Sequence, residues 1–297
     1  MPISMNSICA QCLMKRHVDT ARPLGDDETA TKFAKGLMEA FLSLPEGSDS
    51  CQIGPAVSRL YAQLYGIEGD RYREEKEQSN AFALARLPQI YAQVEKAKDP
   101  IYAALQLSVL GNYLDFAALA GKVRFEDLES MLETAETYDL SGPQYSGFLK
   151  KLESAKSFVL ITDNAGEVVF DRVLAETIQK VYPDIKITFL VRGGPANNDA
   201  LREDCAVAGI SFPVKDSGLC IGGTPLSLIS EEAKALLQNA DVILAKGMGN
   251  TESMYGCGLP VYYAFLVKCA RFEQVFEKPY MTPMFVSDKA YETKTMG

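Results

Sequence analysis

The sequence has 297 residues, of which 47% are hydrophobic and 23% charged, as is ordinary for a folded globular protein. Its formal net charge of −9 argues against a nucleic-acid-binding surface, which needs clustered basic residues, although a few placed cations and a metal would still admit a small anion. No apolar run approaches the roughly 20 residues of a membrane span, which argues against a membrane protein.

The cysteines and the start of the chain indicate a compartment. Seven cysteines, an odd number, are scattered along the sequence, which favours reduced thiols over a disulfide framework. The first residues lack the charged and apolar regions of a signal peptide. We therefore expect a cytoplasmic protein with no nucleic-acid or membrane partner.

Residues 1–145 are predicted to be helical. Phe33, Leu37 and Phe41 have the spacing of an amphipathic helix, and a further helical face covers Glu126 to Tyr138. Between them, residues 79–98 read as helical with an interruption at Pro88, and Pro100 opens another run to about Leu119. Residues 139–146 have the most linker-like composition in the chain.

Residues 146–297 are predicted to form a second, α/β part. Apolar runs and helical patterns alternate here: strands are expected at 157–162, 186–191, 241–245 and 260–267, and helices near 167–181, 198–208 and 230–238. Such alternation predicts a Rossmann-like, doubly wound and mainly parallel sheet, packed against the helical part.

The turn after the first strand carries the strongest functional signal. Asp163 and Asn164 follow a buried run directly, at the position where ligands bind in parallel sheets. Their oxygens suit Mg²⁺ or Mn²⁺, although the same residues also cap helices and form turns. Two further runs end in similar polar turns, 192–199 and 246–252, and in a parallel sheet the three turns meet at one edge.

These motifs together resemble the metal-dependent damage-control phosphatase family, long catalogued as a domain of unknown function. The matching segments are 163–167 (Asp-Asn-Ala-Gly-Glu), 192–195 with 198–199, 246–252 and 111–115, and the CxxC of Cys9 and Cys12 resembles the short prokaryotic-type branch. The resemblance implies a site between the helical and α/β parts, with a divalent cation (Mg, Mn, Co or Ni) held by Asp163, Asn164 and Asp199. It implies hydrolysis of phosphate monoesters of small damaged or surplus metabolites, such as sugar phosphates or phosphopantetheine-like compounds.

Phosphate binding is expected from the last turn. Lys246 ends a strand and would place its ammonium in the cleft as a point charge on a phosphoryl oxygen, unless it merely extends to solvent. Gly247 and Gly249 would let backbone N–H groups approach the phosphate, and Asn250 would add a side-chain donor.

The remaining candidates are ambiguous. Asn112 is expected to touch phosphate or its water, and Asp115 to orient Asn112 or a lysine, unless both are surface residues. Glu167 is either the general base or a first-turn helix acid, and Arg192 either a phosphate clamp or a structural ion pair. With these, the groups expected to act in catalysis are Asp163, Glu167, Asn112 and Lys246.

Other readings stay open. Cys9 and Cys12 with His17 form only half of a zinc site and receive no role. The only histidine, His17, lies far along the chain from the cleft motifs, which disfavours histidine-based phosphatase chemistry. A Rossmann-like methyltransferase or a non-catalytic metal- or nucleotide-binding protein is the alternative, but no GxGxxG follows the first strand.

Overall fold

A six-stranded sheet forms the centre of the computed structural model, which describes residues 3–119 and 121–288. Within that part of the chain the strand order is β3-β2-β1-β4-β5-β6. The first five strands are parallel, and β6 pairs antiparallel with β5. This confirms the predicted mainly parallel α/β sheet. The strands are β1 (Ser157–Ile161), β2 (Lys186–Val191), β3 (Val214–Asp216), β4 (Val242–Lys246), β5 (Val261–Leu266) and β6 (Pro283–Ser287).

The central strands are apolar because helices cover both faces of the sheet. β4 and β5 are buried along their whole length, as parallel strands inside an α/β protein are. The four predicted strands are present as β1, β2, β4 and β5. β3 and β6 were not predicted, because β3 has three residues and is only partly buried, and both lie at edges of the sheet.

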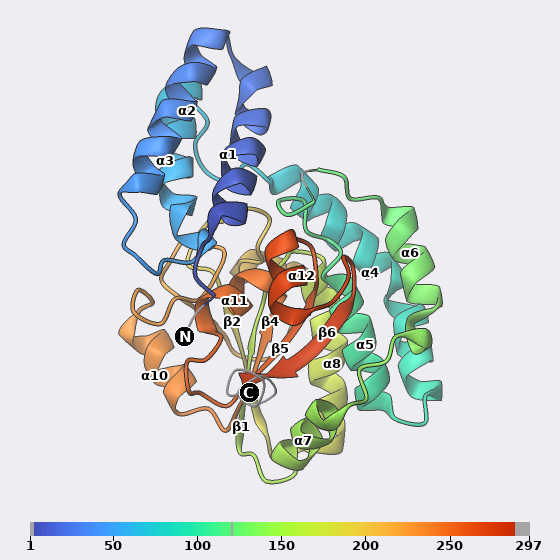
Figure 1. Ribbon diagram of the computed structural model, residues 1–297. Coiled ribbons are helices and arrows are strands. Elements are labelled where there is room, and N and C mark those ends of the chain that lie inside the picture. The colour runs from blue at the N-terminus through green and yellow to red at the C-terminus, as the bar shows by residue number, and fades with distance from the viewer. Residues whose placement is uncertain (1–2, 120, 289–297) are drawn as a thin grey trace.

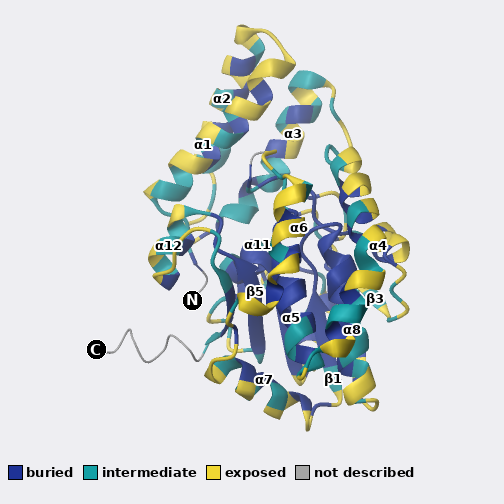
Figure 2. Ribbon diagram, turned by 90° about the vertical axis from the view of Figure 1, so that its right-hand side faces the viewer, coloured by how far each residue is buried: buried dark blue, intermediate teal, exposed yellow. Residues whose placement is uncertain are grey.

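One face of the sheet packs against a layer of largely N-terminal helices. Its innermost member, α5, is buried along nearly its whole length and contacts α8 and α4. Figure 2 shows the strands as a buried layer behind these helices. The layer comprises α4 (Arg73–Lys96), α5 (Pro100–Gly111), α6 (Phe125–Glu133), α7 (Pro143–Leu152), α8 (Glu167–Val181) and α9 (Arg202–Val207).

The opposite face packs against three shorter helices. Side chains of Val159, Ile243 and Phe265 form a second core with this layer. The helices are α10 (Glu231–Gln238), α11 (Gly247–Met254) and α12 (Ala270–Phe276). The sheet is therefore the middle of three layers.

The helical prediction differs from the structure at several points. The run from Pro100 ends at Gly111 and not near Leu119, and the helix expected near 198–208 is only α9. Pro88 lies inside the continuous helix α4 and does not interrupt it. A proline in a helix interior costs about 3 kcal/mol, and the packing of α4 on α5 and α8 offsets that loss. The linker-like segment is also short, because Pro143 is already the first residue of α7.

The first three helices form a unit with their own core. They are α1 (Ser7–Ala21), α2 (Asp27–Leu42) and α3 (Gly54–Tyr65), with a 3₁₀ turn, η2 (Ser50–Ile53), before α3. Figure 1 shows this three-helix unit standing apart from the helices that cover the sheet. Its core consists of Leu13, Ala21, Phe33, Leu37, Ile53, Val57 and Tyr61. The first helices of the chain thus pack in two places, α1–α3 above the sheet and α4–α6 against it.

In the described residues, no helix is both long enough and apolar enough to cross a membrane.

Candidate functional site

A cavity lies at the carboxyl ends of the parallel strands, beneath the three-helix unit. The strand order reverses between β1 and β4, and this switch point opens a crevice in doubly wound sheets. The cavity has a volume of about 110 Å³, far above the roughly 10–15 Å³ needed for one water. Asp163, Asn164 and Asp199 line its floor.

Backbone hydrogen bonds bring these three residues together. Asn164 and Asp199 form an antiparallel bridge that joins the loops after β1 and β2. The Ala200 N–H donates to the Asp163 carbonyl at 2.7 Å, and the Ala165 N–H donates to the Asn198 carbonyl at 2.9 Å. The two loops therefore hold the two acids on one wall.

Arg192 lies between the two acids. Its Nε donates to Asp199 Oδ2 at 2.6 Å, and its terminal nitrogen lies 3.6 Å from Asp163 Oδ1. Its other donors reach Thr224, Asn250 and the carbonyls of Gly222 and Gly223. The guanidinium is buried and fully engaged, which is the geometry of the structural ion pair rather than of a free phosphate clamp.

The acids are electrostatically suited to a cation. Burial, followed by the nearby charges of Asp199 and Glu167, raises the pKa of Asp163 well above its ordinary value. Burial raises the pKa of Asp199 to about 6 despite the Arg192 ion pair. Two carboxylates held close in a buried site repel each other, and a bound cation would relieve that repulsion.

The donor set fits a hard divalent cation. Asp163 Oδ1 and Asp199 Oδ1 accept no hydrogen bond from any residue that the structure describes. Asn164 Oδ1 accepts from Asn198 at 3.1 Å and keeps a second lone pair. Among the described residues no three His, Cys, Asp or Glu side chains are grouped for a metal. The candidate ligands are two carboxylates and one amide oxygen.

A buried network supports the floor from behind. The Asn112 amide, at the end of α5, donates to Asp163 Oδ2 at 3.0 Å and to Glu167, while its oxygen accepts from the Leu266 N–H. Asn164 donates to the same two carboxylates, at 2.9 and 2.8 Å. Asn112 and Glu167 are completely buried and do not line the cavity. Both therefore position Asp163 and Asn164 in this arrangement.

Lys246 is turned away from the cavity. Its ammonium donates to Glu167 and Asp171, each at 2.7 Å, and to the Ser108 carbonyl at 2.9 Å. The side chain is completely buried, and although burial alone would lower its pKa, the two carboxylates raise it. The expected placement of the ammonium in the cleft is not what the structure shows, because α5 and α8 cover the end of β4 and supply these acids.

The turn after β4 serves packing as well as the cavity. A Cβ on Gly247 would fall 1.9 Å from Asp163 Oδ2, and the residue has φ +79°, so only glycine fits. Gly249 lines the cavity. Asn250 is buried, accepts from Arg192, and donates to the carbonyls of Thr162 and Lys246, so it ties β1 to β4 rather than facing the cavity.

Asp115 lines the cavity and pairs with a lysine. Its carboxylate lies 2.7 Å from Lys268 Nζ, which also donates to the Asn112 carbonyl at 2.6 Å. The lysine partner considered for Asp115 is thus Lys268.

Sequence reasoning missed the roof of the cavity. Arg16 and His17 on α1, and Arg71 before α4, line it together with Glu252 at the end of α11. His17 is distant from the cleft motifs only along the chain. Burial, followed by the charges of Arg16 and Arg71, lowers the pKa of His17 to about 3, so it is neutral. No periodicity in α1 indicates this location.

Glu252 is a cavity acid with a pKa of about 7. It accepts a hydrogen bond from the Ser50 N–H at 3.2 Å and another from the Ser50 hydroxyl. Burial raises its pKa to about 7. The sequence offered one signal for it, as the last residue of the 246–252 motif.

The CxxC cysteines lie outside the cavity. Both are free thiols on α1, with Cys9 half-buried and Cys12 exposed.

Comparison with known proteins identifies the family. Residues 5–279 match the family model described as the damage-control phosphatase ARMT1-like domain. A damage-control phosphatase of Archaeoglobus fulgidus is 30% identical over 275 residues, covering 90% of this chain and 93% of that one. An uncharacterized protein of Methanocaldococcus jannaschii is 32% identical over 273 residues, 88% of each chain.

A solved structure of similar fold supports the same family. The crystal structure of a DUF89 family protein from Pyrococcus horikoshii has a TM-score of 0.80 and 25% sequence identity, and covers 96% of this chain and 99% of that one. The chain therefore belongs to the damage-control phosphatase family, as its motifs indicated, and the relatives' names support a phosphatase role.

Proposed function

We propose that this protein is a divalent-metal-dependent phosphatase that hydrolyses phosphate monoesters of small metabolites. The observation that carries the proposal is the convergence of Asp163, Asn164 and Asp199 on one cavity at the switch point of the sheet. Free thiols at all seven cysteines support a cytoplasmic location.

The floor residues would hold the cation. Asp163 and Asp199 offer charged oxygens and Asn164 a neutral one, a set suited to Mg²⁺, Mn²⁺, Co²⁺ or Ni²⁺. When bound, such an ion supplies charge neutralisation on the phosphoryl oxygens and polarises water. Arg192 fixes the direction of both carboxylates, and Asn112 and Glu167 fix Asp163 and Asn164.

Proton transfer is best supported at Glu252. An effective general base has a pKa near the working pH, and its carboxyl meets that requirement inside the cavity. Glu167, the earlier candidate, accepts hydrogen bonds at both oxygens and lies outside the cavity. Removing the proton from an attacking water is therefore assigned to Glu252.

The test measures metal binding and turnover separately. We expect Asp163→Asn and Asp199→Asn to abolish Mn²⁺ binding in calorimetry and hydrolysis of a generic aryl phosphate, while circular dichroism shows a folded protein. Asp184→Asn, the same change at an exposed position, should affect neither. Full activity of Asp199→Asn at limiting metal would exclude this residue as a ligand.

The organic part of the substrate is open to a direct screen. Sugar phosphates, phosphopantetheine-like compounds and nucleotides, each with Mg²⁺, Mn²⁺, Co²⁺ and Ni²⁺, would rank substrates and metals together. Absence of metal-dependent phosphate release from all of them would contradict the proposal.

A further inference from the structure

Two arginines of the roof lie at the junction of the floor cavity and a second cavity. The second cavity has a volume of about 170 Å³ and extends between α1, the start of α4 and the loop residues Phe116, Ala117 and Gly121. Both cavities share five wall residues: Arg16, His17, Arg71, Ala117 and Asn197. A ligand seated on the floor would therefore extend past these two side chains.

Neither Arg16 nor Arg71 forms an ion pair with any carboxylate among the residues that the structure describes. Both side chains are half-buried, whereas Arg192 is buried and paired with Asp199. Partly desolvated arginines that face a cavity are suited to bind carboxylate or phosphate through two parallel hydrogen bonds.

The surrounding residues hold the two arginines in place. The Arg71 guanidinium lies 3.7 Å from the centre of the Tyr61 ring, a cation–π contact that fixes it against α3. Arg16 lies 3.5 Å from His17 Nε2, and the neutral, buried imidazole adds no competing charge. Asn197 has φ +50°, a conformation that costs most side chains energy, at the rim shared by both cavities.

The charges of the two walls are opposite. The floor carries Asp163 and Asp199 and would account for one phosphoryl group through a cation, whereas the roof carries the two arginines and a single acid, Glu252, in a protein of net charge −9. A phosphate monoester whose organic part is uncharged would offer no anionic group to the roof arginines. A partly desolvated charge gains from a ligand of opposite charge more than a fully hydrated one does.

We propose, building on the phosphatase function above, that Arg16 and Arg71 select substrates that carry a second anionic group, a phosphate or a carboxylate, beyond the reacting phosphoryl group. The three-helix unit is then the specificity-determining part of the site. Both arginines contact the substrate at a distance from the phosphoryl group that reacts.

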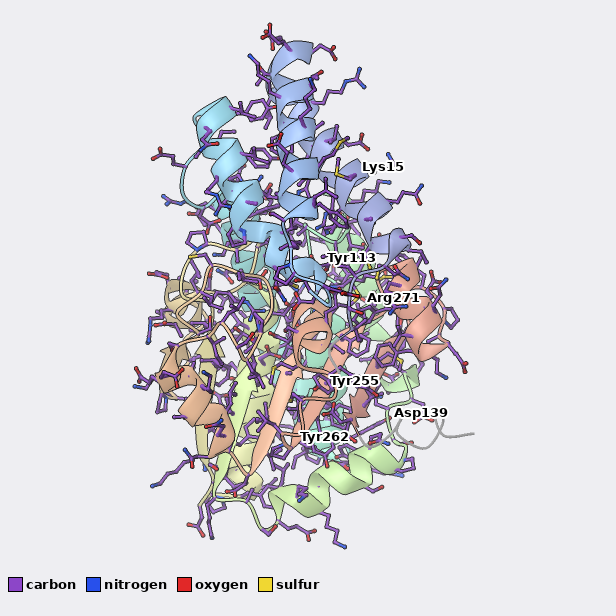
Figure 3. The ribbon with its side chains drawn as sticks, turned by 60° about the vertical axis from the view of Figure 1, so that its left-hand side comes forward. Lys15, Tyr113, Asp139, Tyr255, Tyr262 and Arg271 are labelled. Carbon is purple, nitrogen blue, oxygen red and sulfur yellow. The ribbon has the colours of Figure 1, made fainter. Side chains whose placement is uncertain are left out.

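The experiment compares substrates with and without a second anionic group. The probes are fructose 1,6-bisphosphate, 3-phosphoglycerate and a neutral aryl phosphate, tested with Arg16→Gln and Arg71→Lys, the latter keeping the charge while removing the planar fork. Matched controls are Lys15→Gln and Arg73→Gln, adjacent cations that line neither cavity. Lys15 lies on the exposed side of α1 (Figure 3) and pairs with Asp19.

We expect kcat/KM for the preferred two-anion substrate to fall roughly 10- to 150-fold in Arg16→Gln, and much less for the aryl phosphate. The bisphosphate and the phosphorylated acid distinguish a second phosphate from a carboxylate. In both control variants, the ratio of kcat/KM for the two-anion substrate to kcat/KM for the aryl phosphate should equal that of the wild type. Equal losses on the aryl and two-anion substrates, or a wild type without preference between them, would overturn the proposal.

A binding measurement in chelator separates this proposal from the phosphatase function. Without metal, the preferred two-anion compound should raise the melting temperature of the wild type but not of Arg16→Gln. If that shift appears while no substrate is hydrolysed, the arginine site stands and the phosphatase function fails. If hydrolysis occurs but the shift is equal in wild type and Arg16→Gln, the arginine site fails alone.

Discussion

Lys246 shows how the surroundings of a residue decide between two chemical roles. Its ammonium is enclosed by Glu167, Asp171 and a backbone carbonyl, with no exposed surface. Removing one partner of such a buried cluster leaves an uncompensated charge in the interior. Its contribution is therefore expected first in stability.

Lys246→Met should lower the free energy of unfolding by about 3–5 kcal/mol, because Glu167 and Asp171 then remain buried without their cation. Urea denaturation measures this loss. Lys186→Met, on the exposed first position of β2, should change it by less than about 0.5 kcal/mol. Unchanged stability with reduced phosphate-ester turnover would return Lys246 to the phosphate-binding role first expected for it.

Glu252 should produce the acid limb of the pH–rate profile. Its pKa of about 7 means that it is protonated, and unable to accept a proton, below that pH. At saturating metal we expect kcat of the wild type to rise with pH through about 7. Glu252→Gln should be slow at every pH and lack this rise, whereas Glu39→Gln, at an exposed position of α2, should keep it. A Glu252→Gln variant with the wild-type profile would move the base elsewhere.

At the scale of elements, the three-helix unit combines its own core with a wall of the site. Its contacts with the rest of the chain run through α1 to α12 and through η2 to α11. The buried His17 lies where α1 faces the cavity. The stability of this unit is therefore linked to the protonation of one side chain.

We expect the three-helix unit to lose stability as the pH falls from about 6.5 towards 3. The folded-state pKa of His17, about 3, lies below the unfolded value near 6.5, so the unfolded state binds the proton first. The stabilisation of the folded state by neutral His17 is complete above pH 6.5 and is lost as the pH falls through the folded-state pKa. Hydrogen exchange of α1–α3 between pH 4 and 7 measures it, and His17→Gln should flatten the dependence. Identical slopes in the two proteins would show that His17 has no part in it.

At the scale of the whole molecule, the buried carboxylates that would bind a cation lower the stability of the metal-free protein. Asp163 is buried beside Asp199, Glu167 and Asp115, which raises its pKa and makes its charged form costly without metal. A ligand that binds only the folded state stabilises by mass action, about 2.7 kcal/mol at 100 times its Kd. Stability and metal binding are therefore coupled through this carboxyl.

In chelator, Asp163→Asn should melt at or above the temperature of the wild type, since it removes that repulsion. Addition of Mn²⁺ should raise the melting temperature of the wild type only. Thermal unfolding with EDTA and with MnCl₂ makes the comparison. An equal Mn²⁺ shift in both proteins would place the cation away from Asp163.

The class of fold and the residues on the floor of the site could be predicted from the sequence alone. Apolar runs that stop at Asp163, Arg192 and Lys246 mark strands buried on both faces, and strand ends in a parallel sheet meet at one edge. That periodicity is a local property, so four strands and the helix over 167–181 could be predicted. The edge strands β3 and β6 were not predicted: β3 has three residues and none is buried, and β6, although buried at its centre, is a short antiparallel addition at the sheet edge.

Which polar groups face the cavity depends on how distant parts of the chain pack together. Lys246 and Asn250 belong to the predicted motif, yet neither faces the cavity. The packing of α5 and α8 turns Lys246 towards Glu167, and the side-chain oxygen of Asn250 accepts a hydrogen bond from Arg192. Arg16, His17 and Arg71 carry no motif and reach the site only because the three-helix unit stands over the carboxyl edge of the sheet (Figure 1). The direction of a side chain depends on what packs against it from distant parts of the chain, and neither spacing nor composition encodes that contact.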